Sequence, residues 1–425
     1  MSKRKILGNV FSLGVLQLAN YVFPFLTVPY LSRVLTTEHY GLILFSLSFS
    51  TYFSLLCDYG FSLSGTKEVA INASNKSQLN SIVSNITYIK IALFLFSIIL
   101  NLIVVFSYSK FRVHWELYLV NILVLVNNVF FPVWFFQGVE KMKYITIIQV
   151  GVRILSLLLI FTLIHNDSQY FLWPVINVIT SIISAIIAQF ILLKYFSIRY
   201  TKPDFGVIKY QLKEGWHIFI STIAISLYTV SNSFFLGLLT NTVMVAYYAS
   251  AEKIMNAIQG LLGPISQAFF PHLSRVVAED KERGIKALQK ALFLIAGIGL
   301  LISMILFFTA PLVVKLIYGA KYEIATTQAL RVLAVLPFII CLSNVFGVQT
   351  MIPFGLSKPF SRILIISSCV NVLLLIVLIP RFTYIGTAVS VVITESLVTL
   401  MMLGYLHFNG IYIWSGKLIR SYVAK

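Results

Sequence analysis

About a dozen apolar runs, each near twenty residues long, follow one another along this chain and constrain its fold more than any other feature. A helix needs roughly 20 apolar residues to cross a bilayer, so twelve such helices would use roughly 240 residues. Lipid offers no hydrogen-bond partner to an open strand edge, so continuous apolar runs predict helices. Only 11% of the 425 residues are charged, against roughly 25% in a soluble domain. We therefore predict an all-α integral membrane protein with about 12 transmembrane helices.

The predicted helices divide into two halves. Spans are expected at residues 8–32, 40–62, 82–107, 116–138, 145–165, 170–193, 216–239, 243–270, 289–312, 326–348, 362–380 and 385–407, the first being retained and not cleaved as a signal peptide. The longest polar stretch, 194–215, follows the sixth span. We therefore predict an N-terminal six-helix lobe at 1–200 and a C-terminal six-helix lobe at 201–425. Similar residues before the second and eighth spans indicate an internal repeat with an offset of about 205 residues.

The distribution of positive charge orients the predicted spans. If the N-terminus is cytoplasmic, 22 of the 32 Lys and Arg residues fall in cytoplasmic segments, 6 on the opposite face and 4 within spans. The positive-inside rule therefore predicts that both termini are cytoplasmic. This bias and contact with anionic lipid account for most of the net charge of +18, so no nucleic-acid partner is expected.

Polar residues inside apolar runs are the candidate functional residues, because a charge at a helix centre costs roughly 2.5–3.5 kcal/mol. In the first span, Gln17, Asn20 and Pro24 share one helical face. Pro24 and Pro29 each remove a backbone donor and bend the helix. This pattern predicts a bending helix that lines a cavity; the alternative is polar packing between helices.

The eighth span carries a second polar face. Glu252, Asn256 and Gln259 recur at helical spacing, and Lys253 lies beside them. Glu252 and Lys253 would either contact a substrate or coupling ion or form a structural ion pair. Glu395 lies deep in the twelfth span, where protonation would lower its insertion cost. It is a candidate proton carrier, with a neutral contact between helices as the alternative.

Sequence motifs for several other functions are absent. The chain has no GxxxxGK[ST] loop for ATP, no Asp-rich loop for a nucleotide sugar and no Cys/His cluster for a metal. Its three cysteines are scattered and give no disulfide framework. We therefore expect no cofactor, no metal, no catalytic residues and no enzyme activity.

Five segments resemble the O-antigen repeat-unit flippases, which are Wzx-type polysaccharide transporters of the multidrug/oligosaccharidyl-lipid/polysaccharide superfamily. The resemblance is carried by Pro24–Leu35, Tyr40-Gly41, Tyr52–Ala70, Trp134–Gly138 and Tyr247–Lys253. It implies two six-helix lobes around a central cationic cavity. It also implies transfer of an undecaprenyl-pyrophosphate-linked oligosaccharide from the cytoplasmic to the periplasmic leaflet of a bacterial inner membrane by alternating access.

The resemblance also gives the charged residues candidate roles. A pyrophosphate needs cations. The candidate phosphate or sugar contacts are Arg33, Lys67, Arg153 and Lys253. Arg153 could instead extend to the lipid headgroups. Asp58 is expected to pair with a nearby cation at the end of the second span. Some relatives carry an acid where this chain has Asn232, which argues against ion coupling at that position.

The resemblance implies as partners membrane lipid, the lipid-linked oligosaccharide, an O-antigen polymerase and a chain-length regulator. Two other functions remain open. A cation-coupled drug antiporter would favour acids in its cavity, whereas these spans hold few. A membrane polymerase of lipid-linked sugars would need a large outer loop with catalytic residues, whereas the outer loops expected here, near 108–115, 166–169 and 315–325, are short.

Overall fold

The structure is a computed structural model that describes residues 3–413, apart from the side chains of residues 3–7, 10, 221, 224, 225, 227–229, 264, 265, 267 and 268. The terminal residues that were predicted to be cytoplasmic, 1–2 and 414–425, lie outside this range. The described residues form helices joined by turns and include no β-strand. Contacts group the chain into an N-terminal unit, Met1–Ile223, and a C-terminal unit, Ala224–Lys425.

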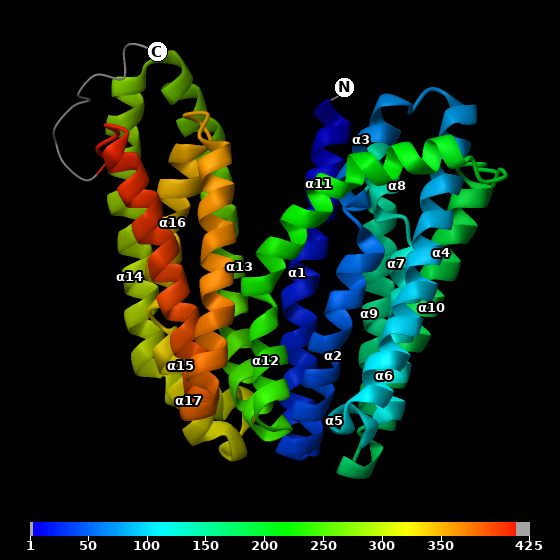
Figure 1. Ribbon diagram of the computed structural model, residues 1–425, viewed down its shortest axis with the longest axis horizontal. Coiled ribbons are helices and arrows are strands. Elements are labelled where there is room, and N and C mark those ends of the chain that lie inside the picture. Colours follow the sequence, from blue (N-terminus) through cyan, green and yellow to red (C-terminus); the bar gives the residue numbers. More distant parts are fainter. Residues whose placement is uncertain (1–2, 414–425) are drawn as a thin grey trace. The chain divides into compact units, whose positions relative to one another are not determined.

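The N-terminal unit contains long helices interrupted at defined positions (Figure 1). Its helices are α1 (Lys3–Val34), α2 (Thr37–Asp58), α3 (Phe61–Ile71), α4 (Lys76–Ser107), α5 (Ser109–Arg112), α6 (Trp115–Ile122), α7 (Val126–Phe130), α8 (Val133–Gly138), α9 (Lys143–Leu163) and α10 (Leu172–Lys194). The span predicted at 40–62 is divided at Tyr59 and Gly60, whose φ angles are 47° and 79°. Glycine suits this turn, since a Cβ on Gly60 would lie 2.9 Å from Ile218. The span predicted at 116–138 is divided before α8 by Pro132.

The C-terminal unit continues from α11 (Phe205–Thr229), which contains the boundary between the two units. Its further helices are α12 (Ser231–Leu239), α13 (Thr242–Glu279), α14 (Lys281–Tyr318), α15 (Glu323–Leu333), α16 (Leu336–Phe346) and α17 (Ser357–Phe408), with a short 3₁₀ helix η3 (Ala320–Tyr322) and a π-helix η4 (Gly347–Met351). α17 is two helices joined at Thr383, where φ is 50° and ψ is −127°.

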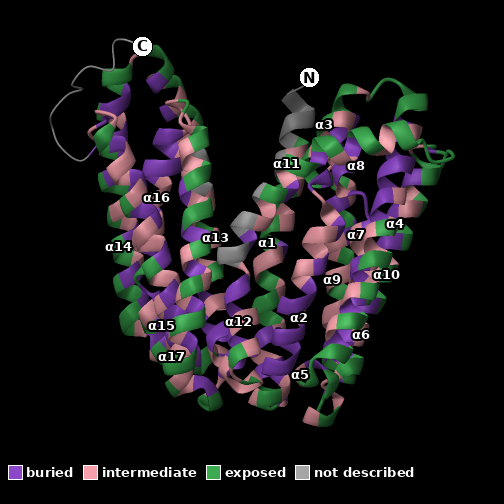
Figure 2. Cartoon of the chain, viewed as in Figure 1, coloured by how far each residue is buried: buried purple, intermediate pink, exposed green. Residues whose placement is uncertain are grey.

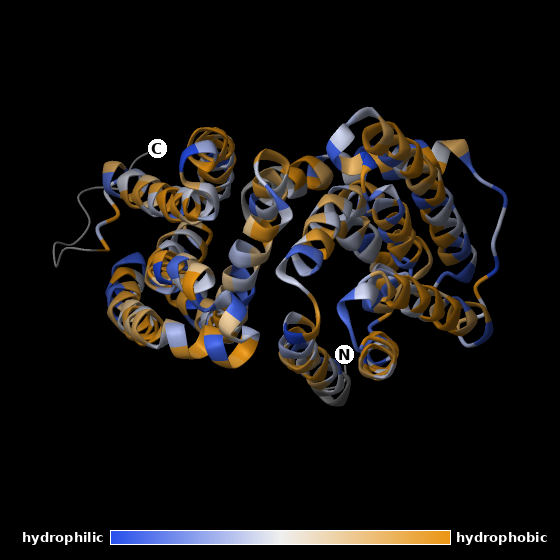
Figure 3. Cartoon of the chain, turned by 90° about the horizontal axis from the view of Figure 1, so that it is seen from below, coloured by the Kyte–Doolittle hydropathy of each residue, from blue (hydrophilic) through white to orange (hydrophobic). Residues whose placement is uncertain are grey.

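Nine helical segments within the described residues are long and apolar enough to cross a membrane. α17, which consists of two helices, is counted once among these nine, and α11, α12 and α13 are not included. The number of twelve spans therefore stays a prediction. On α14, Phe293, Phe308 and Leu316 are 73%, 72% and 71% exposed. A soluble protein rarely exposes apolar surface of this extent, so this face suits lipid. Apolar residues predominate along the helices of both units (Figure 3).

Four capped helix starts recur at a fixed spacing. Thr36 accepts a hydrogen bond from an amide in the first turn of α2, and Asn241 does the same for α13. Asn75 and Asp280 cap α4 and α14 in the same way. Such caps satisfy amides that have no partner within the helix. The starts at 37, 76 and 115 are followed by starts at 242, 281 and 320, an offset of 205 in each case, which supports the internal repeat.

Each unit packs around its own apolar core (Figure 2). Phe135 and Phe136 of α8 are fully buried in the N-terminal core, together with Ile86 of α4. Leu288 of α14 and Phe346 of α16 are buried in the core of the C-terminal unit. Helices therefore present apolar residues both to lipid and to one another, and the buried polar residues stand out against this background.

The connection between α9 and α10 is fastened to the start of α2. Asp167 lies in the short 3₁₀ helix η2 (Asp167–Gln169), and its Oδ1 accepts a hydrogen bond from the Thr36 amide over 2.7 Å. Asp167 Oδ2 lies 2.8 Å from His39 Nδ1. Tyr170 stacks on the His39 ring with 3.9 Å between ring centroids. The Asp167 carboxylate thus links the connection between α9 and α10 to the connection between α1 and α2.

Replacing Asp167 by Asn should lower the stability of the purified protein, because the His39 ring loses a charged acceptor. We expect a loss of about 1 kcal/mol, below the usual contribution of a charged hydrogen bond because His39 and Asp167 are 28% and 33% exposed. Thermal unfolding in detergent, followed by intrinsic fluorescence, measures this change. Glu282→Gln, at an exposed acid in the first turn of α14, is the control, and an unfolding curve for Asp167→Asn that matches this control would contradict the assignment.

Candidate functional site

Glu252 of α13 is a carboxylate inside the C-terminal unit whose two oxygens both accept hydrogen bonds. The Tyr248 hydroxyl, one turn earlier on α13, donates to Glu252 Oε1 over 3.0 Å. The Ser233 hydroxyl of α12 donates to Glu252 Oε2 over 3.1 Å. A buried charge without such partners would be strongly unfavourable. α12 and α13 therefore fix the position of this carboxylate.

A second carboxylate faces the same cavity as Glu252. This cavity measures about 90 Å³, and Glu395 of α17 lines it from the opposite helix. Its other lining residues are Asn232, Tyr248, Met255, Asn256, Gln259, Leu333, Leu336, Ile340 and Val391. Two carboxylates on one small cavity cannot both ionise without mutual repulsion. The arrangement can therefore hold a proton or a cation.

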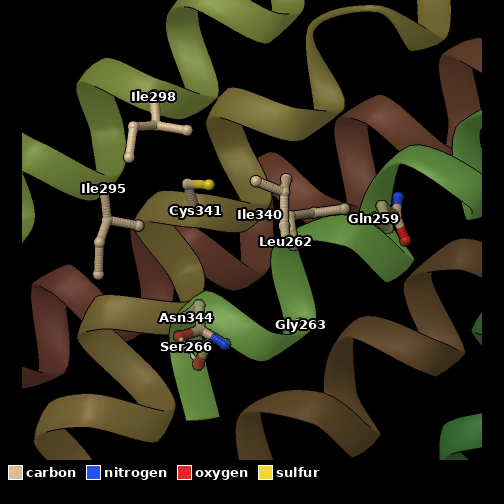
Figure 4. A pocket seen from close by; sticks show the side chains of 9 residues that line it. All are labelled: Gln259, Leu262, Gly263, Ser266, Ile295, Ile298, Ile340, Cys341 and Asn344. Atoms are coloured by element: carbon tan, nitrogen blue, oxygen red, sulfur yellow. Dashed lines mark hydrogen bonds between the residues drawn. The ribbon is translucent and has the colours of Figure 1, made fainter. Parts of the chain in front are cut away.

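A second cavity, of about 100 Å³, continues along α13 and is mostly apolar (Figure 4). Gln259 and Ile340 line both cavities. Figure 4 shows Ser266 and Asn344 together at one end, where the Ser266 hydroxyl donates to Asn344 Oδ1 over 2.7 Å. The Gln349 amide of the π-helix η4 donates to the Ser266 carbonyl oxygen over 2.8 Å. Short π-helical segments often occur at functional sites.

The polar face predicted for the eighth span therefore lines a cavity wall. Glu252 and Asn256 line the first cavity, and Gln259 lines both. Lys253 follows Glu252 on α13, is half-buried and does not line either cavity. The structure thus brings Glu252, Asn256, Gln259 and Glu395 together.

The N-terminal unit contains an ion pair whose cation is buried. Lys90 of α4 is 3% exposed, and its Nζ lies 3.4 Å from Oδ1 of Asp58, the last residue of α2. The same Nζ donates to the Asn128 carbonyl oxygen over 3.1 Å. The Asn128 amide in turn donates to the Ser54 hydroxyl. The cation expected beside Asp58 is therefore Lys90, to which the sequence analysis assigned no role.

The other predicted cations of this unit lie on separate helices. Arg33 is exposed near the end of α1 and donates to the Pro29 carbonyl oxygen over 2.9 Å. Lys67 of α3 is exposed and lines a cavity of about 410 Å³ that Glu68 and Glu214 also line. Arg153 is half-buried on α9. Among the described cavities of the N-terminal unit, none is lined by more than one of these cations.

The polar face predicted for the first span belongs to one continuous helix. Gln17 is exposed on α1 and donates to the Tyr21 hydroxyl over 2.7 Å, while Asn20 is half-buried. Pro24 and Pro29 both lie within α1. The described residues of α1 therefore place both prolines where a bend could form, and they place neither Gln17 nor Asn20 on a cavity described for this unit.

Several residues of these clusters escaped prediction. A charge inside an apolar run could have identified Lys90, since the same signal identified Glu252. Ser233 belongs to a polar face that the sequence indicates in the seventh span. Tyr248 and Asn344 received no role, because hydroxyls and amides in apolar helices commonly bond to their own backbone. Within residues 3–413, no group of three or more His, Cys, Asp or Glu side chains is arranged to bind a metal.

Lys90→Met should destabilise the protein, because it leaves the Asp58 carboxylate without its cation. We expect a loss of about 1 to 2 kcal/mol, below the value for a fully buried pair, because Asp58 is 34% exposed and stays partly hydrated. Adding Asp58→Asn to Lys90→Met should restore part of this loss. The two single variants and the double variant form a double-mutant cycle, measured by thermal unfolding and by the protein level in membranes. Lys76→Met, at an exposed lysine that begins α4, is the control. Equal stability of Lys90→Met and this control would show that the ion pair contributes nothing.

Comparisons with known proteins identify the family of this chain. The chain matches the family of polysaccharide biosynthesis proteins over residues 6–277 and that of the lipid II flippase MurJ over residues 145–425. It is 33% identical to the "Putative O-antigen transporter" of Escherichia coli strain K12 over 96% of this chain and 98% of that protein. It is 29% identical to the protein of the same name from Shigella dysenteriae, over 93% and 98%.

Solved structures share the fold. An inward-facing multidrug resistance MATE family transporter of the MOP superfamily is similar with a TM-score of 0.72 and 16% identity, over 95% of this chain and 98% of that one. The lipid II flippase MurJ in an inward closed conformation gives a TM-score of 0.70 and 15% identity, over 92% and 87%. These matches confirm the all-α membrane fold and the resemblance found in the sequence. The chain belongs to the polysaccharide transporters of the multidrug/oligosaccharidyl-lipid/polysaccharide superfamily, which include the Wzx-type O-antigen flippases.

Proposed function

We propose that this multi-pass membrane protein is a flippase that moves undecaprenyl-pyrophosphate-linked O-antigen oligosaccharide units from the cytoplasmic to the periplasmic leaflet of a bacterial inner membrane. The observation that carries the proposal is the 33% identity to an O-antigen transporter over nearly the whole of both chains. The names of its relatives are those of transporters, so we assign no catalytic residues. The similarity to multidrug transporters is one of fold, at 16% identity, and does not favour drug export.

The amide side chains on the two cavities of the C-terminal unit suit such a substrate. A sugar headgroup that leaves water needs hydroxyl and amide partners inside the helices, and Asn256 and Gln259 line such surfaces. We propose that these two residues, with Gln17 and Asn20 of α1, contact the oligosaccharide during transfer. A pyrophosphate needs cations. For this role we propose Arg33, Lys67, Arg153 and Lys253.

Carboxylates provide a means of coupling transfer to an ion gradient. Glu252 and Glu395 line one cavity, and we propose that they exchange a proton or cation during the cycle. For Asp58 we propose a structural role, because it pairs with the buried Lys90. Bending of α1 at Pro24 and Pro29 would accompany the conformational change.

The cycle that we propose is alternating access by two six-helix lobes, 1–200 and 201–425, made of twelve spans. Both termini would lie in the cytoplasm, as the distribution of Lys and Arg predicts. An O-antigen polymerase and a chain-length regulator would receive the transferred unit on the periplasmic face.

Deleting the gene and following the lipid-linked repeat units tests the proposal. The expected result is loss of long surface polysaccharide, with undecaprenyl-linked units trapped in the cytoplasmic leaflet, reversed by the intact gene. If the units reach the periplasmic face but stay unpolymerised, the flippase proposal fails and a polymerase takes its place.

Lys253→Ala should reduce the transfer of repeat units by about tenfold or more, the effect of losing about 1.4 kcal/mol of binding. Lys253→Arg keeps the charge in a different geometry and should retain more activity. Complementation of the deletion strain, normalised to protein level, measures both variants. Lys286→Ala, at an exposed lysine of α14, is the control. If both Lys253 variants transfer units like this control, Lys253 has no role in transport.

A further inference from the structure

The N-terminal unit contains a cavity to which the proposed function assigns no ligand. This cavity, here called the Lys90 cavity, measures about 330 Å³, within the range of small-molecule sites, roughly 300–1,000 Å³. It is lined by Ser54, Asp58, Ser62, Lys90, Asn127, Asn128, Phe131, Val133, Trp134 and Gln149. These residues come from α2, α3, α4, α7, α8 and α9 and from the turn before α8, so helices distant in the sequence form it together.

Two polar atoms of the lining residues have no partner among the described residues. They are the Asn127 side-chain carbonyl oxygen and the Trp134 indole Nε1, both shielded from solvent. Trp134 is 2% exposed, and its ring packs so closely on Gly65 that a Cβ there would lie 3.1 Å from Cε3. Protein atoms cover both of these polar atoms, so the groups left to meet a ligand are the half-buried amides of Asn127, Asn128 and Gln149 and the two serine hydroxyls.

The charges of the cavity cancel. Lys90 and Asp58 form an ion pair, and the remaining polar side chains are the neutral amides of Asn127, Asn128 and Gln149 with two serine hydroxyls. A pyrophosphate would need a net positive surface, which this cavity does not offer. Amides that donate and accept hydrogen bonds suit the neighbouring hydroxyls of a sugar.

We propose that the Lys90 cavity is a subsite for an uncharged sugar ring of the lipid-linked oligosaccharide, and that it does not bind the pyrophosphate. The inference rests on the proposed function, which supplies the oligosaccharide. In this assignment Asn127 and Gln149 bind sugar hydroxyls. The ion pair between Lys90 and Asp58 keeps the cavity polar without attracting an anion.

Equilibrium dialysis with the full-length protein in lipid nanodiscs tests the subsite. The probe is the oligosaccharide released by mild acid from the strain's lipid-linked repeat units and labelled at its reducing end. Asn127→Leu and Gln149→Leu should each weaken its binding by about tenfold or more. Inorganic pyrophosphate should not displace it. The Gln149 side chain is half-buried and has no hydrogen bond within the described part of the chain, so its replacement should leave the fold intact.

Asn101→Leu is the matched control, because Asn101 is a fully buried amide on α4 that does not line the cavity and has no partner among the described residues. Thermal unfolding shows that each variant is folded. If both cavity variants bind the probe like this control, if pyrophosphate displaces the probe, or if the wild type binds none, the subsite is wrong.

Failure of the subsite is distinguishable from failure of the proposed function. If the cavity variants bind and transfer repeat units normally, the flippase stands and the Lys90 cavity holds only water. If the deletion strain still transfers its lipid-linked units, the flippase proposal fails whatever the binding data show.

Discussion

The absence of hydrogen-bond partners in the bilayer is the constraint on which the rest of this structure depends. Polar groups inside a membrane must find partners within the protein. Side chains therefore cap the starts of α2, α4, α13 and α14, and many Ser and Thr hydroxyls bond to carbonyl oxygens one turn earlier, as Thr87 does to Val83. Glu252 and Lys90 are likewise partnered by neighbouring helices.

Much of the fold followed from the apolar runs, because a helix of fixed rise must match a bilayer of fixed thickness. The interruptions did not follow: Tyr59-Gly60 and Pro132 divide runs whose hydropathy is continuous. The charged residues of the polar face of α13 were predictable from their insertion cost. The partner of Lys90 was not, because Asp58 lies 32 residues earlier on another helix and only packing brings the two together.

Two of the polar clusters lie where helices end or change form, whereas Glu252 and Glu395 lie inside α13 and α17. Asp58 is the last residue of α2, and Asn128 belongs to a helix of five residues. Gln349 lies in the π-helix that follows α16. Irregular backbone in a membrane is tolerated only where protein or a polar cavity surrounds it. At these two clusters a backbone interruption therefore occurs beside a cavity, because polar side chains and water there can bond to the freed backbone groups.

The recurring caps have a consequence for how the two halves differ. With the offset of 205 residues, Lys90 of α4 corresponds to Ile295 of α14, and Glu252 of α13 corresponds to Leu47 of α2. The residues that start the helices are thus alike in kind in both halves, whereas the buried charges are not shared. In a duplicated fold of this type, the residues that determine where helices begin differ from the residues that can bind a ligand. A few substitutions of interior side chains can change which ligand one half binds, while the capping residues that begin the helices of both halves stay the same.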